Sequence, residues 1–267
     1  MTVADVADER PVPEEREVSV RIDRLQRQFG GVIAVEDASF DIRRGSITGL
    51  IGPNGAGKST VVSMIGGSIK PSSGTITFEG VDITALPAYE RARRGLTRTY
   101  QLSSEFRRLT VLENLLVAVP RQRGESLLTL LAGRRWWRQQ EGESLIRARE
   151  LLERFGMAAK ADEYAGQLSG GQKRLVEIMR ALMTEPKVLL LDEPTAGVNP
   201  TLARSIQDDI VALARDGLAI LLIEHELEMI DRLSDVVVVM ALGRVLATGT
   251  MTELKGQKEV LDAYLGD

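Results

Sequence analysis

A glycine-rich loop at residues 52–59 carries the residue types that bind nucleotide phosphates. It fits the pattern G-x-x-x-x-G-K-[S/T], in which backbone N–H groups cradle the phosphates, the lysine contacts the β- and γ-phosphates, and the hydroxyl holds Mg²⁺. The loop consists of Gly52, Pro53, Asn54, Gly55, Ala56, Gly57, Lys58 and Ser59. The pattern predicts a phosphate site to which Lys58 brings its charge and Ser59 brings a metal ligand.

Two carboxylates, Asp192 and Glu193, directly follow an aliphatic run at residues 188–191. Such a run is expected of a strand buried on both faces, and the ligands of open α/β sheets bind at the carboxyl ends of strands. We expect Asp192 to hold Mg²⁺, directly or through water, and Glu193 to polarise the attacking water as a general base. The alternative, two exposed carboxylates opening a turn before Pro194, is disfavoured by the phosphate loop in the same chain.

Two more polar residues follow strands that we expect in the same sheet. His225 is the single histidine of the chain and comes just after the apolar run at residues 218–223. Its side chain could therefore contact the γ-phosphate at the sheet edge that carries Asp192. Gln101 follows a short strand expected at residues 96–100, and its amide could contact Mg²⁺ or the attacking water. For both residues, an incidental surface position is the alternative.

A second phosphate-binding element is predicted at Leu168, Ser169, Gly170, Gly171 and Gln172. Ser169 stands at the N-cap position before an amphipathic helical pattern. The free N–H groups and the dipole of such a helix end attract anions. This element would be redundant if it served the phosphate loop of its own chain, which suggests a nucleotide site completed by a second chain. An ordinary Gly-Gly loop with a capping serine is the alternative.

Short apolar runs alternate with helical patterns along the chain, which predicts an α/β fold with a mainly parallel core sheet. Buried aliphatic strands are expected at residues 47–51, 188–191, 219–223 and 236–240, and more alternating, antiparallel strands at residues 18–22, 40–42 and 75–78. The phosphate loop is expected to lead into a helix at residues 58–69. Residues 102–183 contain few β-branched runs and several helical patterns, so we expect a helical subdomain inserted there.

The composition is that of an ordinary globular protein, with 267 residues of which 43% are apolar and 27% are charged. A net charge of −4 offers no basic surface for nucleic acid. The absence of cysteine excludes disulfides, cysteine-bound zinc and a thiol nucleophile. The longest apolar runs fall far short of the ~18 residues that a membrane-spanning helix needs. Residues 1–17 are acidic and lack an apolar stretch, so we expect a disordered tail and no signal peptide there, followed by one nucleotide-binding domain over residues 18–267.

Together these motifs resemble the ABC ATPase family, the nucleotide-binding subunits of ABC transporters. The resemblance covers roughly residues 18–250 and rests on five motifs in the family's order. The Walker A loop spans residues 52–60 and so includes Thr60, and Gln101 matches the Q-loop. The signature lies at residues 168–172. Walker B with the catalytic glutamate lies at residues 189–193, and His225 matches the switch histidine. The resemblance implies a P-loop NTPase fold, an ABC cassette with a mainly parallel core sheet, an antiparallel β subdomain and an inserted helical subdomain.

The resemblance also implies ATP and Mg²⁺ as cofactors. Phe29 stands where the family places the aromatic ring that stacks on adenine. The metal ligands implied are Ser59, Gln101 and Asp192. The catalytic residues implied are Lys58, Gln101, Glu193 and His225. Glu193 would activate water, and His225 would hold the γ-phosphate.

The partners follow from the same resemblance. A second ABC ATPase subunit, the same chain or a related one, would form a head-to-tail ATP sandwich in which residues 169–172 contact the partner's γ-phosphate; the resemblance favours a related chain. An integral membrane permease would dock its coupling helix in a groove at residues 102–114, and a solute-binding protein would act indirectly. The implied location is the cytoplasmic face of the cell membrane, as a peripheral subunit. No nucleic acid partner is expected.

A finer resemblance points to importers of branched-chain amino acids. It rests on residues 95–101, the pair Asn199-Pro200, residues 224–226, the long stretch between residues 119 and 143, and residues 263–266. Importers of urea and short-chain amides have closely similar ATPase subunits and stay an alternative. One departure concerns Asn199, which stands where the family's D-loop usually ends in aspartate. An amide can still hydrogen-bond across an interface, but it carries no charge.

Other functions stay open beside the importer. An ABC ATPase of DNA repair, translation or cluster assembly is one, although the chain lacks the long coiled coil of repair members and the second cassette of translation members. A non-catalytic regulatory module is disfavoured by Glu193 and His225, and an exporter only by the finer resemblance. The segment at residues 121–138 contains five arginines and Trp136-Trp137. It could pack on the helical subdomain, or it could contact the membrane surface or the permease.

Overall fold

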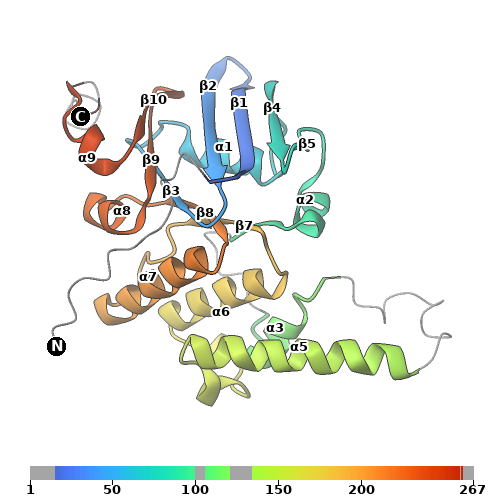
Figure 1. Ribbon diagram of the computed structural model, residues 1–267. Helices are drawn as coiled ribbons and strands as arrows, with labels where there is room; N and C mark the ends of the chain where they lie inside the picture. The colour runs from blue at the N-terminus through green and yellow to red at the C-terminus, as the bar shows by residue number, and fades with distance from the viewer. Residues whose placement is uncertain (1–15, 100–105, 121–133, 259, 261–267) are drawn as a thin grey trace.

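The computed structural model describes residues 16–99, 106–120, 134–258 and 260. Within this part of the chain the strands form a ten-stranded mixed sheet in the order β5-β4-β1-β2-β10-β9-β3-β8-β7-β6 (Figure 1). The strands are β1 (Val18–Phe29), β2 (Val32–Arg43), β3 (Ile47–Ile51), β4 (Ser73–Phe78), β5 (Val81–Asp82), β6 (Leu96–Arg98), β7 (Val188–Asp192), β8 (Ala219–Ile223), β9 (Val236–Ala241) and β10 (Arg244–Gly249). The α-helices are α1 (Lys58–Ile65), α2 (Ala88–Arg94), α3 (Val111–Leu116), α5 (Arg134–Arg154), α6 (Gly170–Met183), α7 (Pro200–Arg215), α8 (Leu227–Leu233) and α9 (Met251–Leu254), with 3-10 turns η3 (Ala158–Lys160) and η4 (Ala165–Gln167).

The aliphatic strands form the parallel centre of the sheet. β3 pairs in parallel with β8 and β9, and β7 pairs in parallel with β8 and β6. All residues of β3, β7 and β8 are buried. Burial on both faces explains why their sequences are continuous aliphatic runs and do not alternate with polar residues. The predicted parallel core is confirmed.

The remaining strands form the antiparallel part of the sheet. β1 pairs antiparallel with β2 and with β4, and β4 pairs antiparallel with β5. β10 joins this part to the core, because it pairs antiparallel with β9 and meets β2 in parallel at Arg244 and Asp37. The antiparallel β subdomain expected from the resemblance is therefore present, next to the parallel strands in one continuous sheet.

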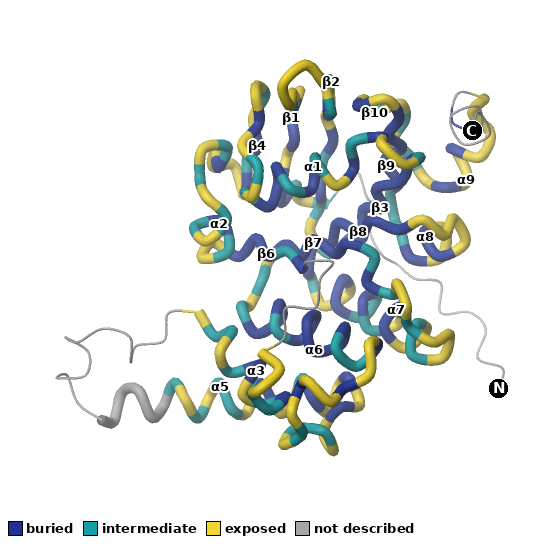
Figure 2. Tube along the Cα trace, turned by 180° about the vertical axis from the view of Figure 1, so that it is seen from behind, coloured by how far each residue is buried: buried dark blue, intermediate teal, exposed yellow. Residues whose placement is uncertain are grey.

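Two hydrophobic cores lie on opposite faces of the central strands. Leu189 and Leu191 of β7 belong to the core that includes α6 and α7. Val188 and Leu190 of the same strand belong to the other core, formed with α1 and the antiparallel strands. This alternation follows from the two-residue period of a strand. Figure 2 shows the result as buried segments running through β3, β7, β8 and α6.

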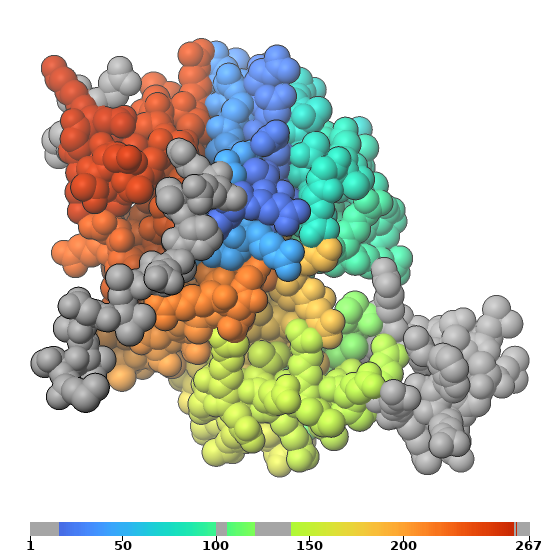
Figure 3. Space-filling view, viewed as in Figure 1, coloured from blue at the N-terminus to red at the C-terminus, as the bar shows by residue number. Residues whose placement is uncertain are grey.

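The helices of the middle third of the chain pack together on one side of the sheet. α3, α5 and α6 lie side by side in the lower part of Figure 1 and share one core with the central strands. Leu115 of α3, Leu152 of α5 and Leu175 of α6 are all members of that core. α5 forms much of the surface at this end in Figure 3. The limits of the inserted subdomain, residues 102 and 183, stay a prediction.

Helix α1 is shorter than predicted. It ends at Ile65, four residues before the expected end at Ile69. Gly66 is the C-cap residue, and Gly67 has a φ of +79°. Glycine at this position takes the left-handed conformation that ends a helix at little steric cost. Two glycines in succession therefore stop the helix where the apolar pattern alone suggested that it would continue.

Strand lengths also differ from those expected. β1 and β2 each span 12 residues, because the two strands pair with each other through several register shifts over nearly their whole length. β6 ends at Arg98, while the expected strand continued to residue 100. The pairing goes one residue further, since the Thr99 N–H donates to the Leu190 carbonyl at 3.0 Å. Long-range pairing, which a local pattern does not record, sets these lengths.

Several predicted features lie outside the described residues. They are most of the acidic tail at residues 1–17, Gln101 and part of the groove at residues 102–114, most of the arginine-rich segment at residues 121–138, and residues 263–266. No helix in the part of the chain that the structure describes is long and apolar enough to cross a membrane.

Buried Arg91 fastens α2 to the end of α1. Its Nη1 donates to the carbonyl oxygens of Met64 and Ile65, each at 2.7 Å. Its Nε and Nη2 donate to the carbonyl oxygens of Leu86 at 2.9 Å and Thr84 at 3.0 Å. Burial lowers the pKa of Arg91 to about 10, so the guanidinium stays protonated at neutral pH. One side chain thus satisfies the last carbonyls of the helix that follows the phosphate loop.

Arg91→Leu is expected to lower the free energy of unfolding by about 3 kcal/mol, because it leaves buried carbonyl oxygens without their charged donor. Urea unfolding measures the change. Arg93→Leu is the control on the same helix, since Arg93 is exposed and lies over the Tyr89 ring; it should cost less than about 0.5 kcal/mol. Equal effects of the two substitutions would contradict the assigned role of Arg91.

Candidate active site

The parallel pairing of β3, β8 and β7 brings three predicted site segments to one edge of the sheet. Leu50 of β3 and Asp192 of β7 both pair with Ile223 at the end of β8. The phosphate loop leaves β3 at this edge, Glu193 follows β7, and His225 follows β8. Residues separated by more than a hundred positions in the sequence therefore meet where open α/β sheets bind ligands.

Lys58 is held at the mouth of the phosphate loop by the loop itself. Its Nζ donates to the carbonyl oxygens of Gly52 at 2.6 Å and Pro53 at 2.9 Å, and the residue is only 6% exposed. Burial lowers the pKa of Lys58, while the charges of Glu193 and Asp192 oppose that shift. The Lys58 amine is thus held inside the phosphate loop, and its contact with phosphate oxygens stays a prediction.

The amino end of α1 is open to an anion. Its N-cap residue is Gly57, which has a φ of +97° and provides no side-chain cap. The N–H groups of the first turn and the helix dipole therefore point at the loop without a side chain to occupy them. This arrangement is the one that binds phosphate at helix N-termini in P-loop proteins.

Positions 52 and 57 must be glycine, because neighbouring backbone atoms leave no room for a Cβ atom. A Cβ atom on Gly52 would lie 2.0 Å from the Met240 carbonyl oxygen, and one on Gly57 would lie 2.6 Å from the Ala34 carbonyl oxygen. These contacts show that β9 and β2 pass directly beside the loop. Because β2 and β1 form one hairpin, they also bring the hairpin end that carries Phe29 to the side of the loop.

Phe29 lies at the end of β1, and the residue is 42% exposed. The guanidinium carbon of Arg27 lies 4.5 Å from the ring centroid. A cation above one face of a partly exposed ring leaves an aromatic surface of the kind that a nucleobase can stack on. The position is compatible with the predicted adenine contact, which stays a prediction.

Asp192 is almost fully buried and is held by an arginine. Arg98 Nη2 donates to Asp192 Oδ2 at 3.1 Å, and Arg98 Nη1 donates to Ser63 Oγ at 2.8 Å. The side chains of Arg98 and Asp192 are 11% and 2% exposed. Such a pair holds the carboxylate in one orientation and compensates its charge in a dry environment.

The residues present fit a magnesium ion. Asp192 Oδ1 is buried and has no hydrogen-bond partner among the described residues, so one carboxylate oxygen remains for a cation. Ser59 supplies a hydroxyl at the start of α1. Mg²⁺ prefers such oxygen ligands and is usually completed by substrate phosphates and water. The described residues contain no group of three or more acidic, histidine or cysteine side chains that could hold a metal ion.

Glu193 and His225 form a hydrogen-bonded pair at the same edge. His225 Nε2 and Glu193 Oε1 lie 2.7 Å apart, and their side chains are 50% and 25% exposed. Glu193 has a φ of +48°, which is unusual for a residue other than glycine. The structure therefore places the predicted general base and the predicted γ-phosphate contact against each other, within reach of solvent.

Thr195, which is half-buried, and the buried Glu224 pack next to this pair. Thr195 Oγ1 donates to Glu224 Oε1 at 3.0 Å. Burial raises the pKa of Glu224, while the hydrogen bonds from Thr195 and from the His225 backbone lower it. Glu224 thus links the turn after Glu193 to the segment that carries His225.

The predicted signature element forms a capping box. The Gln172 N–H donates to Ser169 Oγ at 3.3 Å, and the Ser169 N–H donates to Gln172 Oε1 at 3.0 Å. A Cβ atom on Gly170 would meet nothing within 4 Å, whereas one on Gly171 would lie 2.8 Å from Leu202 of α7. The helix start is therefore capped and packed on α7, while the exposed side at Ser169 and Gly170 stays open to an anion.

Asn199 is the N-cap of α7. Its Oδ1 accepts from the Leu202 N–H at 3.0 Å, and Pro200 occupies the first helical position. Asparagine caps helices about as well as aspartate does. The missing charge at this position therefore has no effect on the local structure of α7.

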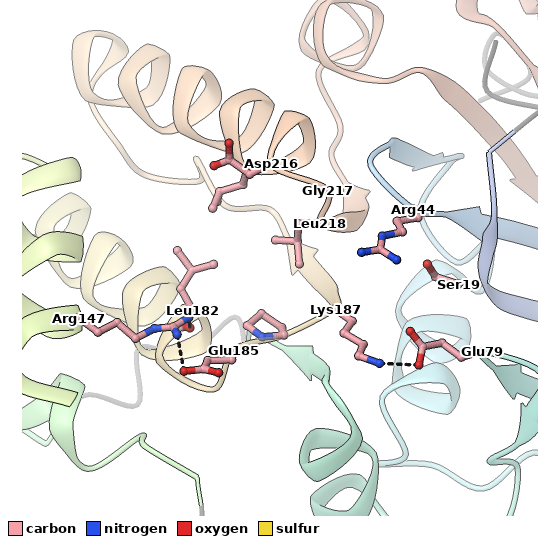
Figure 4. Close-up of a pocket in the computed structure, with 12 residues that line it drawn as sticks. Ser19, Arg44, Glu79, Arg147, Leu182, Glu185, Lys187, Asp216, Gly217 and Leu218 are labelled. Atoms are coloured by element: carbon pink, nitrogen blue, oxygen red, sulfur yellow. Dashed lines mark hydrogen bonds and ion pairs between the residues drawn. The ribbon is translucent and has the colours of Figure 1, made fainter. Parts of the chain in front are cut away.

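A pocket of about 410 Å³ lies at the opposite edge of the sheet (Figure 4). Its lining includes Lys187 and Leu218, which directly precede β7 and β8, so it sits at the amino ends of these strands. Lys187 Nζ pairs with Glu79 at 2.6 Å, and Arg147 pairs with Glu185. These charges neutralise one another far from the phosphate loop, and we assign the pocket no part in nucleotide chemistry.

Two arginines of the site were missed by the sequence analysis. Arg98 holds Asp192, and Arg174 of α6 donates to main-chain carbonyl oxygens of the turn around Glu193. For Arg98, the available signal was a charged residue at the end of a short strand. For Arg174, it was the opposite charge of Glu177, three positions further along the same helix. Neither signal names a partner, because each partner comes from a distant part of the chain.

Comparisons with known proteins agree with this geometry. The family model described as ABC transporter matches residues 35–196. The chain is 40% identical over 248 residues to the high-affinity branched-chain amino acid transport ATP-binding protein LivG of Salmonella typhimurium, covering 92% of this chain and 97% of that protein. It is 38% identical over 242 residues to a probable LivG protein of Archaeoglobus fulgidus, covering 91% and 93%.

Solved structures show the same fold. The crystal structure of a nucleotide-free ATP-binding cassette from an ABC transporter superposes with a TM-score of 0.81 at 36% identity. The match covers 94% of this chain and 100% of that one. The similarity therefore extends over the antiparallel strands, the parallel core and the helices that pack on it.

Gly52→Ala is expected to abolish nucleotide binding and to lower the free energy of unfolding by about 3 kcal/mol, because its Cβ would overlap the Met240 carbonyl oxygen. Titration with a fluorescent ATP analogue and urea unfolding measure the two effects. Gly80→Ala is the matched control, since Gly80 also has a positive φ of +77° but no atom within 4 Å of its added Cβ. It should cost about 1–2 kcal/mol and leave nucleotide affinity unchanged. Normal binding by Gly52→Ala would refute the assigned loop geometry.

Proposed function

Because this chain belongs to the ABC transporter family, we propose that it is the ATP-hydrolysing subunit of an importer for branched-chain or related amino acids. The similarity to the LivG proteins supports the solute class, since they share nearly their whole length with this chain and are named for branched-chain amino acid transport. Transport of urea or a short-chain amide is the alternative within the same subfamily. The choice between them belongs to the partner proteins that bind the solute.

The observation that carries the hydrolytic part of the proposal is the contact between Glu193 and His225. A carboxylate 2.7 Å from an imidazole, at the sheet edge that also holds Lys58 and Asp192, is the arrangement needed to activate water beside a γ-phosphate. A module that only bound ATP would not require this pair. The geometry therefore supports a hydrolase over a non-catalytic nucleotide switch.

The chain's own residues provide binding, orientation and proton transfer. The N–H groups of the loop and of α1 bind the phosphates, and Lys58 neutralises the β- and γ-phosphate oxygens. Glu193 accepts the proton of the attacking water, and His225 orients both the Glu193 carboxylate and the γ-phosphate. Catalysis then depends mainly on positioning and on charge stabilisation.

The metal would be held by residues of the same edge. Ser59 and Asp192 are the ligands that fit, and Gln101, which lies outside the described residues, is proposed as the third. A Mg²⁺ ion held by these residues would supply positive charge that neutralises the charge developing during transfer.

The open helix start at Ser169 supports a second cassette as partner. In the proposed head-to-tail dimer, Ser169 to Gln172 of one chain contact the γ-phosphate bound to the other, and the second chain is a copy or a related subunit. An integral permease, contacted through residues 102–114 on the cytoplasmic face of the membrane, and an external solute-binding protein complete the proposed complex. Adenine stacking on Phe29 completes the nucleotide contacts.

Glu193→Gln is expected to lower steady-state ATP hydrolysis by at least about 100-fold, because the amide cannot accept the proton of water. ATP affinity should stay within about twofold, since positioning of the phosphates is unchanged. The measurement uses the complex that co-purifies with the tagged full-length chain from detergent-solubilised membranes. Glu226→Gln is the control, because Glu226 is exposed and follows His225 by one residue.

Two results would contradict this part of the proposal. Hydrolysis by Glu193→Gln at the wild-type rate would remove Glu193 from the catalytic role. Recovery of the chain without any integral membrane protein would favour an ABC ATPase that does not serve a transporter.

Ser169→Arg tests the two-chain site. The substitution removes a helix cap, at a cost of about 1 kcal/mol, and places a bulky side chain where the partner's nucleotide is expected. The ATP affinity of the isolated chain should stay within about twofold. The rate of hydrolysis by the assembled complex should fall at least tenfold, which corresponds to an activation barrier higher by about 1.4 kcal/mol or more. Ser205→Arg, at an exposed position of α7, is the control. Loss of ATP affinity in the isolated chain would show that the signature serves its own nucleotide.

A further inference from the structure

We infer that Arg174 of α6 is a positioning residue that holds the general base Glu193 in its working orientation. The inference rests on the proposed hydrolysis of ATP and adds a residue that no motif of the site contains. It concerns the Glu193 turn, defined here as Asp192, Glu193 and Pro194. Three observations carry it, namely the hydrogen bonds of Arg174, the backbone conformation of Glu193, and the burial of the Arg174–Glu177 pair.

The first observation is that one guanidinium contacts every residue of the Glu193 turn. Arg174 Nη2 donates to the carbonyl oxygens of Asp192 and of Glu193, the latter at 2.9 Å. Arg174 Nε donates to the Pro194 carbonyl oxygen at 3.4 Å. A planar guanidinium has donors in a fixed fork and can hold several acceptors at once. The orientation of these peptide groups is thus fixed from the side of α6.

The second observation is that Glu193 needs such support. Its φ of +48° lies in the left-handed region, where a residue other than glycine costs about 1–2 kcal/mol. Conformations of this kind persist only when surrounding contacts hold them. The Glu193 N–H donates to the Ile223 carbonyl oxygen at 3.0 Å. β8 therefore holds the amide side of Glu193, and Arg174 holds the carbonyl side.

The conformation held in this way is the catalytic one. With Glu193 in it, the carboxylate reaches His225 at 2.7 Å. Relaxation of φ to the ordinary β or α region would rotate the side chain relative to the backbone anchors and break that contact. Arg174 acts on the peptide groups and does not touch the reacting atoms, so its role is to position the base.

The third observation is that Arg174 is itself anchored within α6. Its Nη1 donates to Glu177 Oε2 at 2.5 Å, and both residues are buried. A buried guanidinium needs a counter-charge, and Glu177 supplies it from the next turn of the same helix. The anchored pair therefore moves with α6, the helix whose first residues form the signature element.

This anchoring links two half-sites through one chain. In the proposed dimer the start of α6 contacts the partner's nucleotide, while Arg174, in the second turn of α6, holds the base that acts on the chain's own nucleotide. If α6 shifts when it binds the partner's γ-phosphate, Arg174 would move with it and would displace Glu193 through its hydrogen bonds to the carbonyl oxygens of the Glu193 turn. The structure thus contains a rigid element through which occupancy of one site can affect hydrolysis at the other.

The test uses Arg174→Lys in the full-length chain, within the complex that co-purifies from membranes. Lysine keeps the positive charge for Glu177, but its three N–H donors sit on a single nitrogen and cannot reach Glu177 and all three carbonyl oxygens at once. We expect kcat for ATP hydrolysis to fall by about 10- to 100-fold with KM for ATP within about threefold, because displacement of a catalytic group affects the chemical step. Glu177→Gln, which removes the carboxylate that pairs with Arg174, should also lower kcat.

Amide hydrogen exchange supplies a readout besides activity. The Glu193 N–H, bound to the Ile223 carbonyl, and the Ala196 N–H, bound to the Glu193 carbonyl at 3.1 Å, should exchange faster in Arg174→Lys than in the wild type. Exchange in β3 and in the rest of β8 should stay unchanged. A general loss of stability would instead accelerate exchange throughout the core.

Arg147→Lys is the matched control. Arg147 also reaches α6 with a guanidinium, donating to the Leu182 carbonyl oxygen at 3.0 Å and pairing with Glu185. These contacts are at the other end of α6 and do not involve the Glu193 turn. Its replacement should leave kcat within about twofold of the wild type, since single surface contacts of this kind contribute little.

The outcomes separate this inference from the proposed function. Wild-type turnover in Arg174→Lys, or a higher KM with unchanged kcat, would overturn the positioning role and leave the ATPase proposal intact. Faster exchange throughout the core would also overturn it, in favour of a purely structural role. A wild-type complex without ATPase activity would overturn the proposed function and this inference together. A lower kcat with local exchange confined to residues 193–196 would establish it.

Discussion

The parallel register of β3, β8 and β7 positions the candidate site residues at the carboxyl-end edge of the sheet. Parallel strands end at the same side of a sheet, so the segments that follow them must meet there. Lys58 comes from the loop after β3, Glu193 from the turn after β7, and His225 from the segment after β8. These strands are buried on both faces and consist of aliphatic residues, which makes their register costly to change. A rigid apolar centre thus sets the positions of polar groups that lie outside it.

Around this centre, charged groups are kept in a dry environment by pairing. Asp192 is held by Arg98, and Arg174 is held by Glu177. An unpaired buried charge would cost several kcal/mol, whereas a fully hydrogen-bonded pair offsets most of its desolvation. The pairs contribute little net stability for the same reason, so their value lies in orientation. Each fixes one element of the site, the carboxylate at the end of β7 in one case and the turn after it in the other.

Most residues of the candidate site could be predicted to lie together, because each belongs to a short, local sequence pattern. The phosphate loop, the carboxylates after β7 and the histidine after β8 are each recognisable from neighbouring residues, and the aliphatic runs identified the strands before them. What could not be predicted depends on contacts between distant segments. Arg98 and Asp192 are 94 positions apart in the sequence, and nothing local connects them. The early end of α1 was missed for a different reason, because the apolar pattern continued past Gly66 and Gly67 while their backbone preferences ended the helix.

The strained conformation of Glu193 follows from the same architecture. A residue that continued β7 in the extended conformation would align its side chain with the pleat and with the neighbouring strand. The left-handed turn at Glu193 takes the chain out of the sheet immediately after Asp192, so that adjacent carboxylates can serve different purposes, one buried beside Arg98 and one directed to His225. Such a turn is stable only if both of its sides are held. β8 holds one side as part of the rigid sheet, and α6 holds the other through Arg174. The position of Glu193, the proposed general base, therefore depends on how α6 packs against the sheet, and α6 is the helix whose start is proposed to contact the partner's nucleotide.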